Sequence, residues 1–201
     1  MTTATTPTTY QNYIGGEWRD SASGATFAST NPARDAEVLG HFQRSTPADV
    51  DAAIRAAQAA LPAWRATPAP ERGEIVLRAA LLLEERREEY ARLLTREMGK
   101  VLKEARGDVQ TAIDFGKFVA AQGRAAEGAT VPSSLRDKIC LTVREPLGVV
   151  GIITPWNFPI AIPAWKTFPA LVAGNTAVLK PASDTPLLAL KLVELLIDAG
   201  L

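Results

Sequence analysis

Two candidate groups for chemistry follow two short apolar segments in the last third of the chain. Residues 147–153 (LGVVGII) are continuously apolar and rich in β-branched side chains, which is typical of a buried strand in a parallel sheet, and residues 176–179 form a second such segment. Asn157 lies in the loop after the first segment, and Lys180 directly follows the second. Because ligands bind at the carboxyl ends of parallel strands, both side chains are predicted to lie at one binding edge.

Asn157 offers a neutral N–H donor between two aromatic side chains, Trp156 and Phe158. Such a donor can stabilise an oxyanion that develops on a carbonyl group, an effect of about 3 kcal/mol when the geometry is good. The same amide can instead hydrogen-bond within its own loop, and the local sequence alone favours this structural role. Trp156 can pack against a ligand, although a core position is the default for tryptophan.

Lys180 and Ser183 each have two open interpretations. The Lys180 ammonium can bind ribose hydroxyls or phosphate at the strand end, or it can extend into solvent. Ser183 can hydrogen-bond a ribose or cap the turn that follows it. No G-x-G-x-x-G motif follows the first apolar segment, so the usual dinucleotide fingerprint is missing.

Cys140 is a weak candidate for a nucleophile. Lys138 and Arg144 on the same strand face could lower the pKa of its thiol, but the cysteine is predicted in mid-strand, with no histidine near it in sequence to act as a base. His41 is the only histidine, which excludes a multi-histidine metal site. We predict no metal site in this chain.

Composition narrows the class of protein. The 201 residues include 22 Lys plus Arg and 22 Asp plus Glu, and this balance argues against nucleic acid or an anionic membrane as a partner. A single cysteine excludes an internal disulfide framework and fits a reducing, cytoplasmic location. No apolar run is long enough to span a bilayer, and the N-terminus lacks the features of a secretory signal. We therefore expect an α/β protein that acts on small molecules.

The elements that must position these residues follow from periodicity. Residues 1–9 are predicted to form a disordered tail, and Gly15 and Gly16 to form the turn of a hairpin. One helix is expected from Pro47 to about Leu61, before Pro62. A second helical region shows an apolar stripe over residues 76–94 and continues, with interruptions at Gly99 and Gly107, to about Ala126.

The second half of the chain is predicted to contain a half-exposed strand over residues 135–143, where Ile139, Leu141 and Val143 share one face. Residues 147–199 then read as strand, helix, strand, helix with short loops, and Gly174 and Asn175 close the first helix. This order predicts a right-handed βαβ unit in an open parallel sheet.

The segment TPWNFPIAIPAWKTFPALVAGNTAVLKPASDTP resembles the cofactor-binding region of the NAD(P)-dependent aldehyde dehydrogenase superfamily. The motifs YIGGEW, STNPA, AAQAALPAWRATP, REMGK and VREPLGVVGIITPWNFP occur in that family's order, so the resemblance covers residues 10–201. It implies the N-terminal portion of that fold: an incomplete, Rossmann-like NAD(P)-binding domain at residues 10–127 and 147–201, and a β-arm for oligomerisation at residues 128–146.

The resemblance also implies roles for individual residues. Asn157 matches the side-chain half of the oxyanion hole that holds the hemithioacetal oxygen, and Lys180 matches the lysine that binds the adenosine ribose. Ser183 matches a position that often carries glutamate in NAD-specific members, so serine implies that NADP is tolerated. The full set of implied cofactor contacts is Ile153, Thr154, Pro155, Trp156, Lys180, Ala182 and Ser183.

The family's nucleophilic cysteine and general-base glutamate match no position here, and Cys140 is not that nucleophile. We therefore expect the catalytic domain to be absent and the chain to be the N-terminal part of an enzyme that oxidises an aldehyde to a carboxylic acid as a homodimer or homotetramer. The alternative is a naturally truncated, non-catalytic module for nucleotide binding or oligomerisation.

Overall fold

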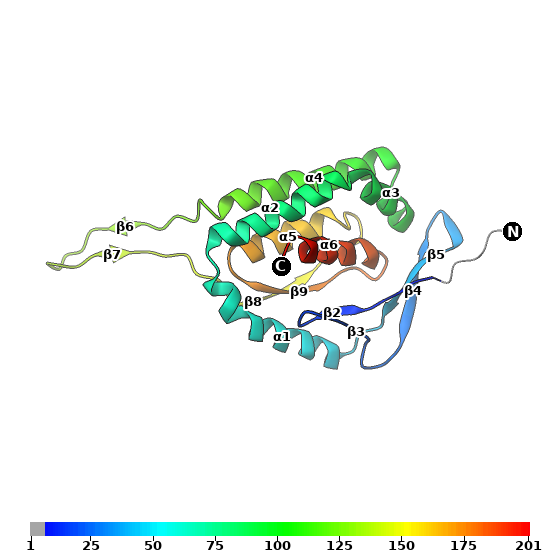
Figure 1. The fold of residues 1–201 in the computed structure, drawn as a ribbon, viewed down its shortest axis with the longest axis horizontal. Helices are drawn as coiled ribbons and strands as arrows, with labels where there is room; N and C mark the ends of the chain where they lie inside the picture. Colours follow the sequence, from blue (N-terminus) through cyan, green and yellow to red (C-terminus); the bar gives the residue numbers. More distant parts are fainter. Residues whose placement is uncertain (1–6) are drawn as a thin grey trace.

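The computed structural model describes residues 7–201 of the chain (Figure 1). This part contains six helices: α1 (Pro47–Ala66), α2 (Ala69–Glu85), α3 (Arg87–Met98), α4 (Leu102–Gln122), α5 (Ala161–Val172) and α6 (Pro186–Asp198). It also contains nine short strands: β1 (Thr9–Tyr10), β2 (Asn12–Ile14), β3 (Glu17–Arg19), β4 (Thr26–Asn31), β5 (Arg34–Gln43), β6 (Thr130–Val131), β7 (Cys140–Leu141), β8 (Val149–Ile153) and β9 (Thr176–Lys180). No helix in residues 7–201 is long and apolar enough to cross a membrane.

The predicted βαβ unit is confirmed. β8 and β9 pair in parallel with Ile153 opposite Lys180, and α5 connects them. The pair lies between α1 and α5, while α2 packs on both α5 and α6, and α4 packs on α5 (Figure 1). As predicted, α5 is closed by a left-handed residue, Gly174, with φ at 89°.

The expected burial of β8 is wrong for most of the strand. Ile152 is buried, but Ile153 is 81% exposed and Leu147, before the strand, is 96% exposed. The reason is that β8 has a hydrogen-bonded neighbour on only one side among the described residues. A strand in a two-stranded sheet keeps one edge open, so an apolar sequence alone does not bury it.

The helices form the main hydrophobic core. The side chains of Leu83, Ile113, Phe168 and Leu188 are fully buried at its centre. α2 and α4 approach closely because Gly116 has no side chain: a Cβ there would lie 2.8 Å from the Cβ of Ala80. The helical layer is therefore a firm support for loops that rest against it.

The N-terminal region confirms one prediction and corrects another. The hairpin at Gly15 and Gly16 forms as β2 and β3, with Tyr13 opposite Trp18. Thr9, however, belongs to β1, which pairs in parallel with β5 and places Thr9 opposite His41. The predicted disordered tail is therefore wrong at Thr9, and residues 1–6 lie outside the described residues.

Two helix boundaries differ from the prediction. α1 continues through Pro62 to Ala66 because Trp64, in its last turn, packs on the core and donates a hydrogen bond to the Leu171 carbonyl over 3.1 Å. The break at Gly99 is confirmed, with φ at 78°, but Gly107 lies inside α4, which ends at Gln122 instead of Ala126. Buried side chains on both sides of Gly107 hold that helix together.

The β-arm projects from the body as a long hairpin (Figure 1). Only residues 130–131 and 140–141 pair as strands, so the longer predicted strand over residues 135–143 is wrong. Ile139, Leu141 and Val143 are exposed, because β6 and β7 pack mainly on each other, and the ion pair Arg65–Glu145 joins only the base of the arm to α1.

Candidate functional site

The two strand ends meet as predicted. The Thr154 N–H donates to the Lys180 carbonyl over 3.2 Å, which fixes the loop after β8 beside the loop after β9. Asn157 and Trp156 lie in the first loop and are exposed, and Ser183 is exposed in the second. The polar groups singled out from the sequence therefore gather at the carboxyl ends of β8 and β9.

The Asn157 amide is free to bind a ligand. Its side chain forms no hydrogen bond with any residue in the described range 7–201, so the alternative of a purely local role is not found. Its backbone carbonyl, in contrast, accepts a hydrogen bond from Lys100 Nζ over 2.9 Å. The backbone of Asn157 is thus held while its side chain is exposed.

The residues implied to contact a cofactor differ in exposure. Lys180 is exposed and forms no ion pair with the described residues, so its ammonium is available to a phosphate or ribose. Thr154 is buried, and its Oγ1 has no hydrogen-bond partner in the described chain. The remaining implied contacts are exposed or half-buried: Ile153, Pro155, Trp156, Ala182 and Ser183. Free donors and one orphaned hydroxyl fit a polar ligand such as a dinucleotide.

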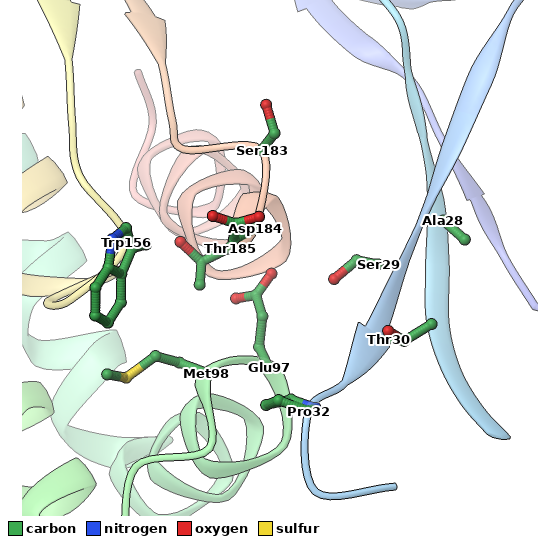
Figure 2. A pocket seen from close by; sticks show the side chains of 10 residues that line it. All are labelled: Ala28, Ser29, Thr30, Pro32, Glu97, Met98, Trp156, Ser183, Asp184 and Thr185. Atoms are coloured by element: carbon green, nitrogen blue, oxygen red, sulfur yellow. The ribbon is translucent and has the colours of Figure 1, made fainter. Parts of the chain in front are cut away.

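Trp156 does not occupy the core position that is the default for tryptophan. It is 52% exposed and lines a cavity of about 350 Å³, which Ser183, Asp184 and Thr185 line from the loop before α6 (Figure 2). Ser29 and Thr30 of β4 form the opposite side. The cavity therefore opens beside the strand ends, between the parallel pair and the N-terminal sheet.

Glu97 contributes a carboxylate to the same cavity. Figure 2 shows this carboxylate directed toward the turn that enters α6, where it accepts hydrogen bonds from the Leu187 N–H over 2.5 Å and the Leu188 N–H over 3.0 Å. These amides are first-turn donors that α6 itself cannot satisfy. Burial raises the pKa of Glu97 to about 7, although the two N–H groups favour the charged form.

Lys100 and Asp108 form a second buried group of charges. Lys100 Nζ lies 2.9 Å from Asp108 Oδ2, and their side chains are 9% and 0% exposed. Burial raises the pKa of the Asp108 carboxyl, and the Lys100 ammonium opposes this shift. No group of three acidic, histidine or cysteine side chains that could hold a metal ion occurs in residues 7–201.

No site role was predicted from the sequence for Glu97, Lys100 or Asp108, although Glu97 and Lys100 lie in the REMGK motif. A signal was present: Asp108 follows Ala105 by three residues on the buried face of α4, and Glu97 follows Leu94 by three residues on the buried face of α3. A carboxylate on an otherwise apolar helix stripe indicates a specific buried partner. Cys140 and His41 lie elsewhere, on the arm and in β5.

Comparison with known proteins identifies the family. The sequence profile of the aldehyde dehydrogenase family matches residues 18–201. The chain belongs to this family. The chain is 44% identical over its full length to the α-ketoglutaric semialdehyde dehydrogenase of Bacillus subtilis and covers 41% of that protein. It therefore spans about 40% of the length of the curated relatives it matches.

Solved structures agree with the family and with the fold. A crystal structure of an NADP-dependent enzyme from Escherichia coli is 44% identical, with a TM-score of 0.92, and the match covers 96% of this chain and 40% of that one. A crystal structure of PnpE in complex with nicotinamide adenine dinucleotide is 37% identical, with a TM-score of 0.91, over 96% of this chain and 39% of that one. The predicted fold, the N-terminal part of an aldehyde dehydrogenase, is confirmed.

Glu97 makes the stability of this aldehyde dehydrogenase chain depend on pH. A carboxyl whose pKa is raised in the folded state binds its proton more tightly there than in the unfolded chain, so the contribution of Glu97 to the free energy of unfolding is fully present below pH 4.5, the ordinary pKa, and is lost as the pH rises to about 7. We expect a loss of about 3 kcal/mol across this window. Glu97→Gln should remove this part of the slope in denaturant unfolding, whereas Glu85→Gln, at an exposed position, should keep it. Equal slopes for all three proteins would contradict this role of Glu97.

Proposed function

We propose that this chain takes part in the NAD(P)⁺-dependent oxidation of an aldehyde to a carboxylic acid. The observation that supports this most directly is the exposed Asn157 amide, which is unpaired in residues 7–201 and held by its backbone in a loop whose first residue, Thr154, is hydrogen-bonded to the Lys180 carbonyl. Membership of the aldehyde dehydrogenase family adds to it. The relatives reported above are named for a semialdehyde and for NADP or NAD, which are the substrate and cofactor classes we propose here.

Asn157 would act on the carbonyl oxygen of the aldehyde. Its amide N–H₂ would donate to that oxygen and strengthen this hydrogen bond as negative charge develops during attack on the carbonyl carbon. The attacking thiolate would come from outside these 201 residues, because Cys140 is the only cysteine and lies on the arm. We propose that Asn157 stabilises charge and transfers no proton.

Lys180 and Ser183 would bind the dinucleotide at the strand ends. When bound, this cofactor supplies the hydride acceptor of the reaction. The Lys180 ammonium would donate to ribose hydroxyls or phosphate, and the smaller contacts would be made by Ile153, Thr154, Pro155, Trp156 and Ala182. The alternative of a non-catalytic module is not favoured, because the relatives of this chain are named as dehydrogenases.

We further propose that the arm, residues 128–146, joins copies of the enzyme into a homodimer or homotetramer, and that the enzyme is cytoplasmic. Exposed apolar side chains on the arm support the assembly. Single, unpaired hairpins are only marginally stable in water, so a partner would also stabilise the arm itself.

Asn157→Ala should lower kcat about a hundredfold and leave the KM for NAD(P)⁺ unchanged, because the variant loses a donor that acts only on the reacting oxygen. Steady-state kinetics of the enzyme that contains this chain is the measurement. Asn157→Asp is the matched control, since it keeps the shape, removes the donor and should be at least as impaired. An unchanged kcat in Asn157→Ala would refute this role of Asn157.

Ser183→Glu should raise the KM for NADP⁺ about tenfold while changing the KM for NAD⁺ far less, because a carboxylate repels the 2′-phosphate that only NADP carries. Ser183→Gln is similar in shape without the charge and should preserve binding of NADP⁺. Similar changes for both cofactors would show that Ser183 does not face the ribose.

Ile139→Lys should shift the enzyme to a smaller assembly in sedimentation velocity, because it places a charge on an arm position that is 83% exposed in the single chain. Val101→Lys, at a position 61% exposed outside the arm, should leave the assembly intact. If Ile139→Lys sediments like the parent enzyme, the arm does not join the subunits through this residue.

A further inference from the structure

Lys100 connects three parts of the molecule through one ammonium group. It follows Gly99 in the short link between α3 and α4. Its Nζ lies 2.9 Å from Asp108 Oδ2, 2.9 Å from the Asn157 carbonyl oxygen and 3.9 Å from the centre of the Phe158 ring. The first contact is on α4, and the other two are on the loop after β8.

Each contact uses a different property of the ammonium. The Asp108 carboxylate balances its charge, the Asn157 carbonyl accepts a hydrogen bond from it, and the Phe158 ring offers its electron-rich face. Together the three contacts surround the group on several sides, and its side chain is only 9% exposed. An ammonium bound in this way cannot shift without breaking at least one contact.

A contribution to the stability of the fold does not by itself explain the buried Lys100–Asp108 pair. The desolvation of a buried ion pair offsets most of its electrostatic attraction, and well-packed apolar residues of similar volume often stabilise a protein as much. The Lys100 ammonium and the backbone N–H of Ala161, at the start of α5, both lower the pKa of the Asp108 carboxyl, but its burial outweighs them and raises this pKa. The pair Lys117–Glu84, which joins α4 to α2 over 2.7 Å, is instead exposed on both side chains. Attachment of one helix to another, which an exposed pair can provide, therefore does not explain why the Lys100–Asp108 pair is buried.

That explanation lies in the loop that the ammonium holds. Fixing the carbonyl of Asn157 and the ring of Phe158 restricts the backbone on both sides of the peptide bond between them, and hence the direction in which the Asn157 side chain leaves the backbone. A displacement of about 1 Å in a catalytic group can reduce the rate about a hundredfold. The Asn157 side chain has no hydrogen bond of its own to the described chain that could hold it.

We propose that Lys100, anchored by Asp108, is a positioning residue that aims the Asn157 amide at the reacting carbonyl oxygen. This inference rests on the proposed function of Asn157. It assigns to Lys100 no contact with substrate or cofactor: Lys100 acts on the reaction only through the backbone of the loop after β8.

Kinetics of the enzyme that contains this chain tests the proposal. Lys100→Met keeps the aliphatic stem and removes the charge and the donors; we expect kcat to fall about tenfold and the KM for NAD(P)⁺ to change less than about twofold. Lys117→Met is the matched control on the exposed pair and should leave both constants unchanged. In an Asn157→Ala background, Lys100→Met should lower kcat by less than about twofold, because two residues that act as one unit are not additive. Full additivity would overturn the proposal.

Hydrogen exchange gives a readout that does not depend on activity. In Lys100→Met, the backbone amide of Ile162, which donates to the Phe158 carbonyl over 3.0 Å, should exchange about tenfold faster than in the parent protein, and in Lys117→Met it should not. Unchanged exchange in Lys100→Met would overturn the proposal. If Lys100→Met does not fold, Asp108→Asn is the substitute, because it removes only the charge that anchors Lys100. It should produce the same local increase in exchange, and unchanged exchange in Asp108→Asn would overturn the proposal.

The experiments distinguish a failure of the proposed function of Asn157 from a failure of the positioning role of Lys100. If Asn157→Ala leaves kcat unchanged, the role of Asn157 is wrong, and with it the catalytic part of this inference. If Asn157→Ala lowers kcat and Lys100→Met changes neither kcat nor exchange, the proposed function stands and the positioning role of Lys100 alone is refuted.

Discussion

Both loops of the candidate site depend on one turn, residues 97–100, in which two oppositely charged side chains are removed from water. The Glu97 carboxylate binds the first N–H groups of α6, and the Lys100 ammonium binds the carbonyl of Asn157. Gly99 separates them with φ at 78°, and a Cβ there would lie 3.1 Å from Cγ of Pro32. The left-handed conformation reverses the chain between the two charges, so that each reaches a different loop. The helical layer thereby fixes the distance between Asn157 and the start of α6.

The order of elements and the position of the site could be predicted from sequence because their signals are local. Two short β-branched segments, separated by a helix that ends in Gly174, predict a parallel pair whether or not the neighbouring strands are known. Since parallel strands place their carboxyl ends together, the meeting of the loops that carry Asn157 and Ser183 followed from topology alone. Family motifs agreed with the predicted order of elements, and the aldehyde dehydrogenase profile and the similar structures confirm the family and the fold.

Burial could not be predicted in the same way, because it depends on what lies beside an element. Ile153 and Leu147 read as core residues but are exposed, since β8 has one hydrogen-bonded neighbour in the described chain. Pro62 reads as a helix end, yet the packing of Trp64 keeps α1 intact beyond it. In each case a tertiary contact, or the lack of one in residues 7–201, outweighed the local preference of the sequence.

The charged residues behind the loops show why the geometry of a site is harder to predict than its location. Lys100 is 57 residues from Asn157 and Glu97 is 90 residues from Leu187, so no spacing rule connects them. What the sequence does reveal is a local inconsistency: Glu97 and Asp108 occupy helix positions where every neighbour on the same face is apolar. A buried carboxylate there is costly unless a partner compensates it, and the partners found are the lysine and the backbone amides that hold the candidate site. An acidic residue on an apolar helix face therefore indicates which helix supports a functional loop before the loop itself can be placed.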